Sequence, residues 1–206
     1  MILPEKEAEA FLKKEGFPVV HQMYCTSSST AIAAAKRIGY PVAMKVVSPT
    51  IIHKSDVGGV ALNLITDTAV MKHFTRMKRL NGFRGVLIQE YVEADALLLG
   101  LKRDSVFGHT VAVGAGGIYT EILKDVSFRA CPVTAADAAD MLHELKVYPI
   151  IAGTRGHTNK VKSVITIILK LSALAATYPQ IAELDINPLL LTATDIRIVD
   201  ARIVLN

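Results

Sequence analysis

Helical and strand-like patterns alternate along almost the whole chain, and this alternation limits the possible folds more than any other feature. Residues 5–15 place Ala8, Phe11 and Leu12 on one helical face and end at Gly16, a residue type that commonly stops helices. Apolar segments of strand length separate the predicted helices. The alternation therefore predicts a protein of the α/β or α+β class, in which helices cover sheets.

The remaining predicted elements divide the chain into two parts. We expect further helices over residues 27–38, 67–77, 134–145 and 160–177, and strands over residues 42–47, 60–65, 85–92, 97–101, 110–113, 118–123, 182–191 and 196–204. Asp67 is expected to cap the helix that follows it. Residues 1–92 are predicted to form an N-terminal part and residues 93–206 a C-terminal part, with a ligand between them, because clefts between lobes commonly bind ligands.

The composition predicts a folded chain without a membrane anchor. Apolar residues make up 51% of the chain and charged residues 20%, which favours a packed core over disorder. The longest apolar segment, residues 164–176, contains Lys170 and is shorter than the roughly 18 residues that cross a bilayer. The first residues lack the basic start and apolar centre of a signal peptide. Cys25 and Cys131 form no CxxC pair, so no disulfide or zinc site is predicted, and a cytoplasmic location is expected.

The charge of the chain gives only a weak indication of its ligand. The formal net charge is +4, and the basic residues are dispersed along the sequence. A mild positive excess suits a phosphate-bearing ligand but does not require one. The sequence shows neither an aromatic RNA-binding motif nor zinc-finger spacing, so nucleic-acid binding is not predicted.

Lys45 is a charged residue inside an otherwise apolar strand, in the segment AMKVVS. Burying an ammonium group without a partner costs free energy. One interpretation is that Lys45 contacts ligand phosphates at the base of a cleft. The alternative is a lysine on an edge strand that extends its charged end to water. The pattern alone favours neither interpretation.

The segment HKSDVGG, residues 53–59, follows this strand and gathers groups that can bind an anion. It contains the side chains of His53 and Lys54, and the adjacent Gly58 and Gly59 allow backbone N–H groups to approach an anion closely. It is not a Walker A loop, because GxxxxGK[ST] is absent. The alternative is an ordinary hairpin loop between two strands.

The segment ELDIN, residues 183–187, carries a more informative pattern. Strand alternation places Glu183, Asp185 and Asn187 on one face and the two apolar residues on the other. The following strand contributes Asp200 within an apolar run. Oxygen atoms of Asn187 and Asp200 on adjacent strands suit Mg²⁺, which takes few protein ligands. The alternative is the polar outer face of a one-sided antiparallel sheet.

Two other features receive structural interpretations. The glycines within residues 114–117 are expected to permit a bend between strands. His109 precedes a predicted strand and is expected to be a solvated turn residue. Outside residues 53–59, the other histidines show no pattern of partners.

Five segments in this order resemble one family, the ATP-grasp domains of ADP-forming acetate–CoA ligases. They are GYPVAMKVVSPTIIHKSDVGGVALNL, VLIQEYV, LGLKRDSVFGHTVAVGAGGIYTEILKDVSFR, ELDINPLLL and IVDARIVL. In the related β-subunit of succinyl-CoA synthetase, an EINPL segment and a downstream aspartate resemble Asn187 and Asp200 here. The resemblance covers nearly the whole chain. It implies the α+β ATP-grasp fold, in which two lobes hold a Mg-nucleotide (Mg²⁺ with ATP or ADP) between them.

Carried over residue by residue, the resemblance implies a nucleotide-binding set, which consists of Lys45, Lys54, Gly58, Gly59, Gln89, Glu90 and Val92. Lys45 would contact the nucleotide phosphates. Gln89, Glu90 and Val92 would form the hinge that holds adenine.

The resemblance also implies the metal ligands and the catalytic group. Asn187 and Asp200 would bind Mg²⁺, and His53 would lie at the γ-phosphate position as a phosphoryl acceptor. Imidazole suits this role because its ordinary pKa of about 6.5 leaves it largely neutral and nucleophilic near pH 7. The family reaction converts acyl-CoA, ADP and phosphate into acid, ATP and CoA, reversibly, through an acyl phosphate and a phosphohistidine.

The resemblance further implies a partner subunit. The chain shows no GxGxxG unit of a dinucleotide-binding fold. It therefore resembles a separate β-subunit that works with a CoA-binding α-subunit, in a hetero-oligomer such as α2β2. The alternatives are a non-catalytic nucleotide-sensing or assembly subunit with the same fold, and an ATP-grasp ligase that joins a carboxylate to an amine.

Three positions differ from the pattern usual in the family. Ala96 stands where relatives have a glutamate, which bears on nucleotide affinity and base preference unless the neighbouring Asp95 replaces it. His109 stands where proline is usual. An acidic residue is usual shortly after the pair Arg155–Gly156, where this chain continues with His157, Thr158, Asn159 and Lys160.

Overall fold

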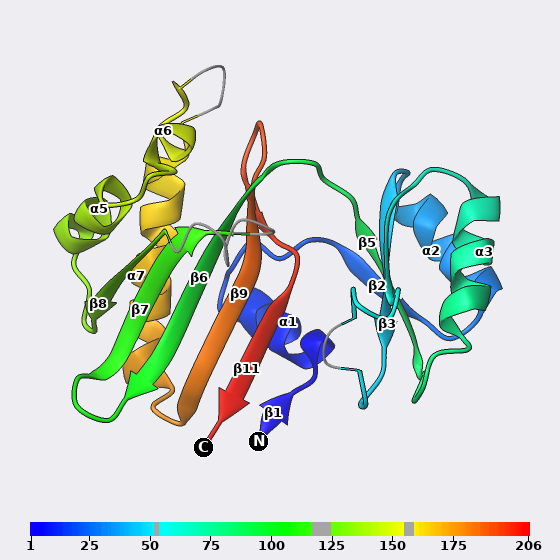
Figure 1. Cartoon of the computed structure of the whole chain (residues 1–206), viewed down its shortest axis with the longest axis horizontal. Coiled ribbons are helices and arrows are strands. Elements are labelled where there is room, and N and C mark those ends of the chain that lie inside the picture. Colours follow the sequence, from blue (N-terminus) through cyan, green and yellow to red (C-terminus); the bar gives the residue numbers. More distant parts are fainter. Residues whose placement is uncertain (52–53, 117–124, 155–158) are drawn as a thin grey trace. The chain divides into compact units, whose positions relative to one another are not determined.

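The computed structural model describes residues 1–51, 54–116, 125–154 and 159–206 (Figure 1). Contacts between residues separate the chain into two units. One consists of Val20–Val92, and the other of Met1–Val19 together with Glu93–Asn206. Residues 1–19, which the sequence places with the N-terminal part, thus pack with the C-terminal part.

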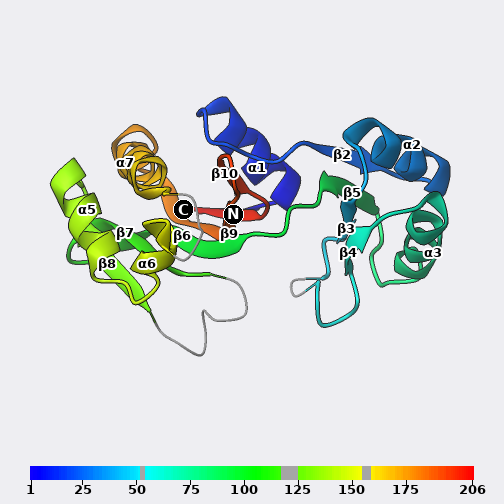
Figure 2. The same ribbon diagram turned by 90° about the horizontal axis from the view of Figure 1, so that it is seen from above.

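The unit of residues 20–92 is a four-stranded antiparallel sheet with two helices on one face (Figure 2). Its elements in chain order are β2 (Gln22–Cys25), α2 (Ser28–Ile38), β3 (Val42–Val47), β4 (Val60–Leu64), α3 (Asp67–Met77) and β5 (Gly85–Glu90). The strand order β2-β5-β3-β4 makes β3 an inner strand. Val42, Met44 and Val46 are fully buried in the core between this sheet and its helices. This core follows from the alternation of apolar residues along β3.

Helix α3 begins differently from the prediction. The prediction that Asp67 caps it is wrong, because the Thr66 hydroxyl accepts the hydrogen bond from the Ala69 backbone N–H at 3.2 Å. Asp67 is already the first helical residue. Its carboxylate lies 2.6 Å from the Lys36 ammonium and accepts a 2.9 Å hydrogen bond from the Tyr40 hydroxyl. Asp67 therefore joins α3 to α2 and the residues after it.

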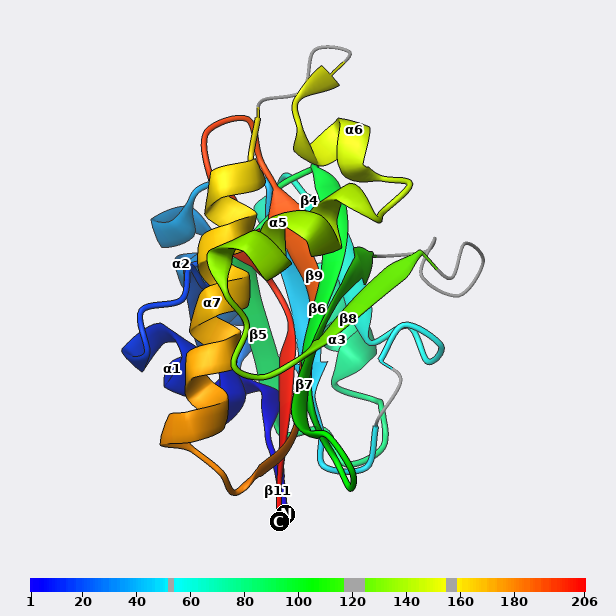
Figure 3. The same ribbon diagram turned by 90° about the vertical axis from the view of Figure 1, so that its left-hand side faces the viewer.

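The second unit is built on a larger antiparallel sheet in the order β1-β11-β9-β6-β7-β8, with β10 paired to β9. Its elements are β1 (Ile2–Leu3), α1 (Glu5–Lys14), β6 (Asp95–Asp104), β7 (Gly108–Ala115), β8 (Val126–Ala130), α5 (Ala135–His143), α6 (Tyr148–Ile151), α7 (Val161–Thr177), β9 (Ile181–Leu191), β10 (Ile196–Ile198) and β11 (Ala201–Leu205). Figure 3 shows α7 between α1 and α5. These three helices contribute to one continuous core with the sheet.

Residues 1–19 belong to this unit because their apolar side chains complete its core. Ala8 and Leu12 of α1 are fully buried there. The ring of Phe11 packs edge-to-face on that of Tyr178, with centroids 4.9 Å apart, and the Tyr178 hydroxyl donates a 2.6 Å hydrogen bond to Glu15. Strand β1 pairs with β11 along the edge of the sheet.

The predicted C-terminal strands differ in two details. The strand expected over residues 196–204 is two strands, β10 and β11, which pair with different halves of β9 and are separated by Val199 and Asp200. The strand expected over residues 118–123 lies outside the described residues. Among the helices that the structure describes, none is both long and apolar enough to cross a membrane.

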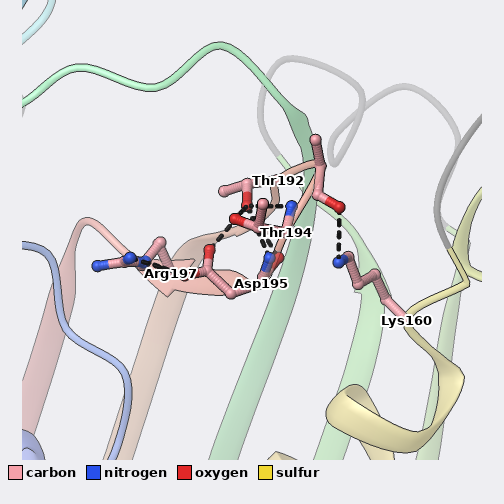
Figure 4. Close-up of polar contacts among 6 residues, drawn as sticks. Lys160, Thr192, Thr194, Asp195 and Arg197 are labelled. Carbon is pink, nitrogen blue, oxygen red and sulfur yellow. Dashed lines mark hydrogen bonds and ion pairs between the residues drawn. The ribbon is translucent and has the colours of Figure 1, made fainter.

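The turn between β9 and β10 is held by a compact set of polar contacts (Figure 4). The Asp195 carboxylate accepts hydrogen bonds from the Thr192 hydroxyl at 2.7 Å and from the Arg197 Nε at 2.9 Å. The Lys160 side chain, only 5% exposed, donates a 3.1 Å hydrogen bond to the Ala193 carbonyl. Lys160 therefore ties the start of α7 to this turn.

We expect Asp195→Ala to lower the free energy of unfolding by about 1–2 kcal/mol near pH 7, because it removes an ion pair and a turn hydrogen bond. The Arg197 guanidinium, helped by the Thr192 hydroxyl, holds the pKa of Asp195 below its ordinary 3.8. A depressed folded-state pKa means that the stabilisation is present above pH 3.8 and is lost as the pH falls through the folded-state value.

Urea unfolding of the protein and the variant across this pH range measures the effect. The difference between them should shrink below pH 3.8. Asp195→Asn, which keeps a hydrogen-bond acceptor without the charge, should lose less stability than Asp195→Ala. A difference that does not change with pH would contradict a contribution from the ion pair.

Candidate functional site

Lys45 lies in the middle of β3, and its side chain is only 7% exposed. Its neighbours Met44 and Val46 point into the core under the helices, so alternation directs Lys45 to the opposite face of the sheet. Because β3 pairs with both β4 and β5, Lys45 is not on an edge strand. The structure therefore removes the alternative interpretation of a lysine that reaches water at a sheet edge.

Gln89 of β5 shares this helix-free face with Lys45. The register pairs Ala43 with Gln89 and Lys45 with Leu87. All four residues alternate with residues that point into the core, so they lie on the face opposite to the helices. Gln89 is 1% exposed, and its Nε2 donates a 2.9 Å hydrogen bond to the Gln22 side chain on β2. The other two predicted hinge residues, Glu90 and Val92, lie at the end of β5 and just beyond it.

The described part of the HKSDVGG segment, residues 54–59, forms a tight turn between β3 and β4. The Gly59 N–H donates to the Lys54 carbonyl at 2.7 Å, and the Gly59 carbonyl accepts from Val46 N–H at 2.8 Å. A Cβ at position 59 would lie 2.6 Å from a Val46 methyl carbon, so no side chain fits there. Gly58 has a φ of +67°, a conformation that favours glycine. His53 lies outside the described residues.

The turn at residues 54–59 has features of both interpretations from the sequence, an anion-binding segment and an ordinary hairpin loop. β3 and β4 pair antiparallel, so the segment does connect a hairpin. However, its tight closure fixes the last glycine directly against Val46, next to Lys45 in sequence. The turn is thus held rigidly beside the strand that carries the buried lysine.

Asn187 and Asp200 lie side by side in the other unit. The Asn187 backbone N–H donates to the Asp200 carbonyl at 3.3 Å, consistent with the pairing of Ile186 with Ala201. Leu184 and Ile186 are buried in the core, and the polar residues between them alternate to the opposite face as the sequence predicts.

Two acidic residues of α1 join Asp200, and the sequence analysis missed them. Carboxylate oxygens of Glu5, Glu9 and Asp200 all lie within 4.8 Å of one another. Glu9 is 1% exposed. A signal was present, because Glu9 lies one residue after Ala8 and three before Leu12, which puts it near the apolar side of α1. Only the pairing of the chain ends brings that helix to Asp200.

Asp185 adds negative charge to this region. Burial, together with the neighbouring carboxylates of Glu183 and Asp200, raises the pKa of Asp185 to about 6, and Arg202 acts in the opposite direction. Carboxylate and amide oxygens are the ligands that hard divalent cations prefer. The donor set around Asp200 therefore fits such a cation.

The structure answers the question about Ala96. Along β6, Leu97, Leu99 and Leu101 point into the core, so Ala96 points to the helix-free face. Asp95 has the parity of Leu97 and pairs with the core residue Leu191. Asp95 is thus on the face opposite to Ala96 and does not replace a carboxylate at that position.

Two other expectations are corrected or refined. His109 is half-buried, and its Nε2 lies 2.7 Å from the Ile181 carbonyl oxygen, so the expectation of a solvated turn residue is wrong. The reason is that β7 runs close to the start of β9, two strands away in the sheet.

Of the glycines in residues 114–117, Gly114 and Gly116 leave no room for a Cβ because Asp125 and Leu97 backbone atoms would lie within 2.5 Å.

The predicted site residues thus form two groups. Lys45, Gln89 and the turn at residues 54–59 belong to the unit of residues 20–92, on or beside its helix-free face. Asn187 and Asp200, with Glu5 and Glu9 added, belong to the other unit. One group is rich in cationic and amide groups, and the other is rich in oxygen ligands.

Comparison with known proteins places this arrangement in a class. The chain matches the ATP-grasp domain family over residues 1–205. It is 41% identical to the β-subunit of acetate–CoA ligase [ADP-forming] I of Pyrococcus furiosus, over 98% of this chain and 91% of that subunit. It is 39% identical to the 4-hydroxybutyrate–CoA ligase [ADP-forming] of Nitrosopumilus maritimus, over 98% of this chain but only 30% of that protein.

A solved structure agrees with these relatives. The acetyl-coenzyme A synthetase 1 of Ca. Korarchaeum cryptofilum, in complex with coenzyme A and Mg-AMPPCP, superposes with a TM-score of 0.87 at 36% identity. The match covers 100% of this chain and 93% of that one, and in that complex a phosphohistidine segment points towards the nucleotide binding site.

The chain therefore belongs to the ATP-grasp family, in the branch of the ATP-grasp subunits and domains of ADP-forming acyl-CoA ligases. The family and the ATP-grasp fold predicted from the sequence are confirmed. The chain spans nearly all of the separate β-subunit but about a third of the single-chain ligase.

We expect Gly59→Ala to lower the free energy of unfolding by about 1–3 kcal/mol, because the added methyl group overlaps Val46 and the Lys54 carbonyl. Gly108→Ala is the matched control. Its φ is +71° and no atom lies within 4 Å of the added Cβ, so it carries only the backbone strain of about 1 kcal/mol. Urea unfolding measures both variants. A smaller loss for Gly59→Ala than for the control would contradict the tight closure of the turn.

Proposed function

We propose that the chain is the nucleotide-binding β-subunit of an ADP-forming acyl-CoA synthetase. The enzyme converts acyl-CoA, ADP and phosphate reversibly into acid, ATP and CoA. The single observation that carries the proposal is the match to a separate ligase β-subunit over 98% of this chain. The buried Lys45 and the oxygen cluster at Asp200 support it, since phosphoryl transfer depends on positioned positive groups and metal ligands. The relatives are ligases by name, so the non-catalytic alternative is not favoured.

The proposal includes a CoA-binding α-subunit in a hetero-oligomer such as α2β2. Single-chain relatives are about three times as long as the part that this chain matches. In the proposed division of labour, the partner binds acyl-CoA, forms the acyl phosphate and releases CoA. The acyl group is then recognised in the partner, and this chain handles only the phosphoryl group and the nucleotide.

The phosphoryl step follows from the groups on this chain. In the direction of ATP synthesis, a terminal oxygen of ADP attacks the phosphorus of a phosphohistidine. A P–O bond forms, the P–N bond breaks, and its electron pair returns to the imidazole. Lys45 and Lys54 would neutralise charge on the phosphates, and Gln89, Glu90 and Val92 would hold the adenine. His53 would carry the phosphoryl group before it passes to ADP.

The residues present fit the Mg²⁺ that this chemistry uses. Asp200 and the Asn187 amide would hold it, with Glu5 and Glu9 adding carboxylate oxygens nearby. When bound, the ion neutralises phosphate charge.

The first prediction of this proposal concerns the metal ligands. We expect Asn187→Ala and Asp200→Ala each to weaken ADP binding about tenfold or more in Mg²⁺, and to change it little in EDTA, because each removes a ligand to a hard cation. Calorimetry of ADP binding to the chain with and without Mg²⁺ measures this. Asp140→Ala, at an exposed position on α5, is the control.

Thermal unfolding of the same variants separates a metal site from a structural role. The melting temperatures without metal should stay close to that of the parent, since both side chains are only half-buried. Variants that bind Mg-ADP like the parent would contradict the proposed metal site.

The second prediction tests the function itself through His53. We mix the chain with its α-partner, acyl-CoA, ADP and labelled phosphate. Acid-labile label should appear on this chain, and ATP should form only when both subunits are present. His53→Ala should abolish the label on this chain and lower ATP formation by about a thousandfold, as expected for loss of a nucleophile. His53→Asn should fail equally, and His21→Ala, at an exposed position, should not.

Each outcome separates one part of the proposal from another. Undiminished ATP formation in His53→Ala would mean that ADP takes the phosphoryl group directly from the partner. Absence of ATP formation by the unaltered pair with any acyl-CoA would contradict the ligase function.

A further inference from the structure

The last turn of α3 is hydrogen-bonded to the second part of the connection between β3 and β4, residues 54–59. The Arg76 guanidinium donates a 2.9 Å hydrogen bond from Nη2 to the Gly58 carbonyl. The guanidinium carbon lies 3.6 Å from where a Cβ of Gly58 would be. Arg76 is exposed, and in the described structure its guanidinium donates this bond to the backbone of the turn.

The segment that follows α3 is hydrogen-bonded to the first part of this connection, residues 48–50. The Ser48 and Thr50 hydroxyls both donate to the Asn81 carbonyl, at 2.9 Å and 3.1 Å. Gly82 is required there, because a Cβ at this position would lie 2.5 Å from the Thr50 hydroxyl oxygen. Residues 48–50 are therefore bound to the segment after α3, and Gly58 is bound to the last turn of α3.

The contact at Gly58 fixes the orientation of one peptide group. The Gly58 carbonyl and the Gly59 N–H belong to the same planar unit and point in opposite directions. Arg76 holds the carbonyl, and the Lys54 carbonyl accepts from the N–H at 2.7 Å. Glycine on both sides would otherwise make rotation of this peptide easy. A rotated peptide would break both hydrogen bonds, and the turn that carries Lys54 would lose its closed form.

We infer that Arg76 is a positioning residue for the phosphate-binding turn. It prevents rotation of the Gly58–Gly59 peptide and so keeps the turn in the form that accepts nucleotide phosphates. It acts through the backbone and does not itself touch the nucleotide. This inference rests on the proposed function, in which Lys54 of this turn contacts the nucleotide phosphates.

The test uses the whole chain and two independent measurements. Amide hydrogen exchange at Gly59 in the nucleotide-free protein reports the turn, and calorimetry with Mg-ADP reports binding. Arg76→Ala should accelerate the Gly59 exchange about tenfold and weaken Mg-ADP binding about three- to tenfold, as expected for the loss of one charge-assisted hydrogen bond. Arg76→Lys, which can still donate to the carbonyl, should restore both to within about threefold.

Lys72→Ala is the matched control for charge. Lys72 lies one turn earlier on α3 and is exposed, and the hydrogen bond to Gly58 comes from Arg76, so the loss of Lys72 removes the same charge without freeing Gly58. It should leave the Gly59 exchange unchanged and alter binding less than about twofold.

The outcomes are distinguishable. Weaker binding in Arg76→Ala with unchanged Gly59 exchange would mean that Arg76 contacts the ligand directly, and faster exchange with unchanged binding would mean that it only stabilises the fold. Either result overturns the inference. Failure of the unaltered chain to bind Mg-ADP would instead overturn the proposed function, on which the inference depends.

Discussion

The alternation of side chains along β9 fixes both the core and the polar face of the larger unit. Leu184 and Ile186 are buried beneath the helices, and Asp185 lies between them on the other face. Since β9 pairs with β6 on one side and β11 on the other, a shift of one residue would bury the Asp185 carboxylate among apolar side chains. Burying an unpaired carboxylate is costly enough to exclude that register. The register that forms the core is thus the one that presents Asn187 next to Asp200.

In the unit of residues 20–92, the same alternation of side chains along a strand determines the position of Lys45. β3 buries Met44 and Val46 under α2 and α3, which leaves Lys45 on the opposite face of an inner strand. An inner strand gives a lysine no path to water along the sheet edge, and a desolvated ammonium group is most stable where negative charge is brought to it. The alternation that forms the core therefore also places Lys45 on the face where the proposed function has it contact nucleotide phosphates.

Local patterns predicted most of the elements, because helix and strand periodicity depend on neighbouring residues. The strands around Lys45 and Asn187 follow from alternation alone, and the order of the five motifs identified the fold. Contacts between residues far apart in the chain leave no periodic pattern in the sequence, so they were not predicted. Glu9 reaches Asp200 only because β1 pairs with β11, and His109 meets the Ile181 carbonyl only because the sheet brings two distant segments together. The prediction of the α3 cap was wrong for a local reason. Thr66 and Asp67 are both good N-cap residue types, and the backbone conformation selects between them.

The pairing of β1 with β11 has a consequence for the order in which the protein forms. Ile2 and Leu3 pair with Val204 and Ile203, so the edge of the larger sheet joins the two ends of the chain (Figure 1). During synthesis, Ile2 and Leu3 are made long before Ile203 and Val204, so they gain these partners late. Residues 20–92 form a contiguous unit and can fold in the meantime. The unit of residues 20–92, with Lys45 in place, is therefore expected to be folded while the sheet that carries Asn187 and Asp200 is still being synthesised.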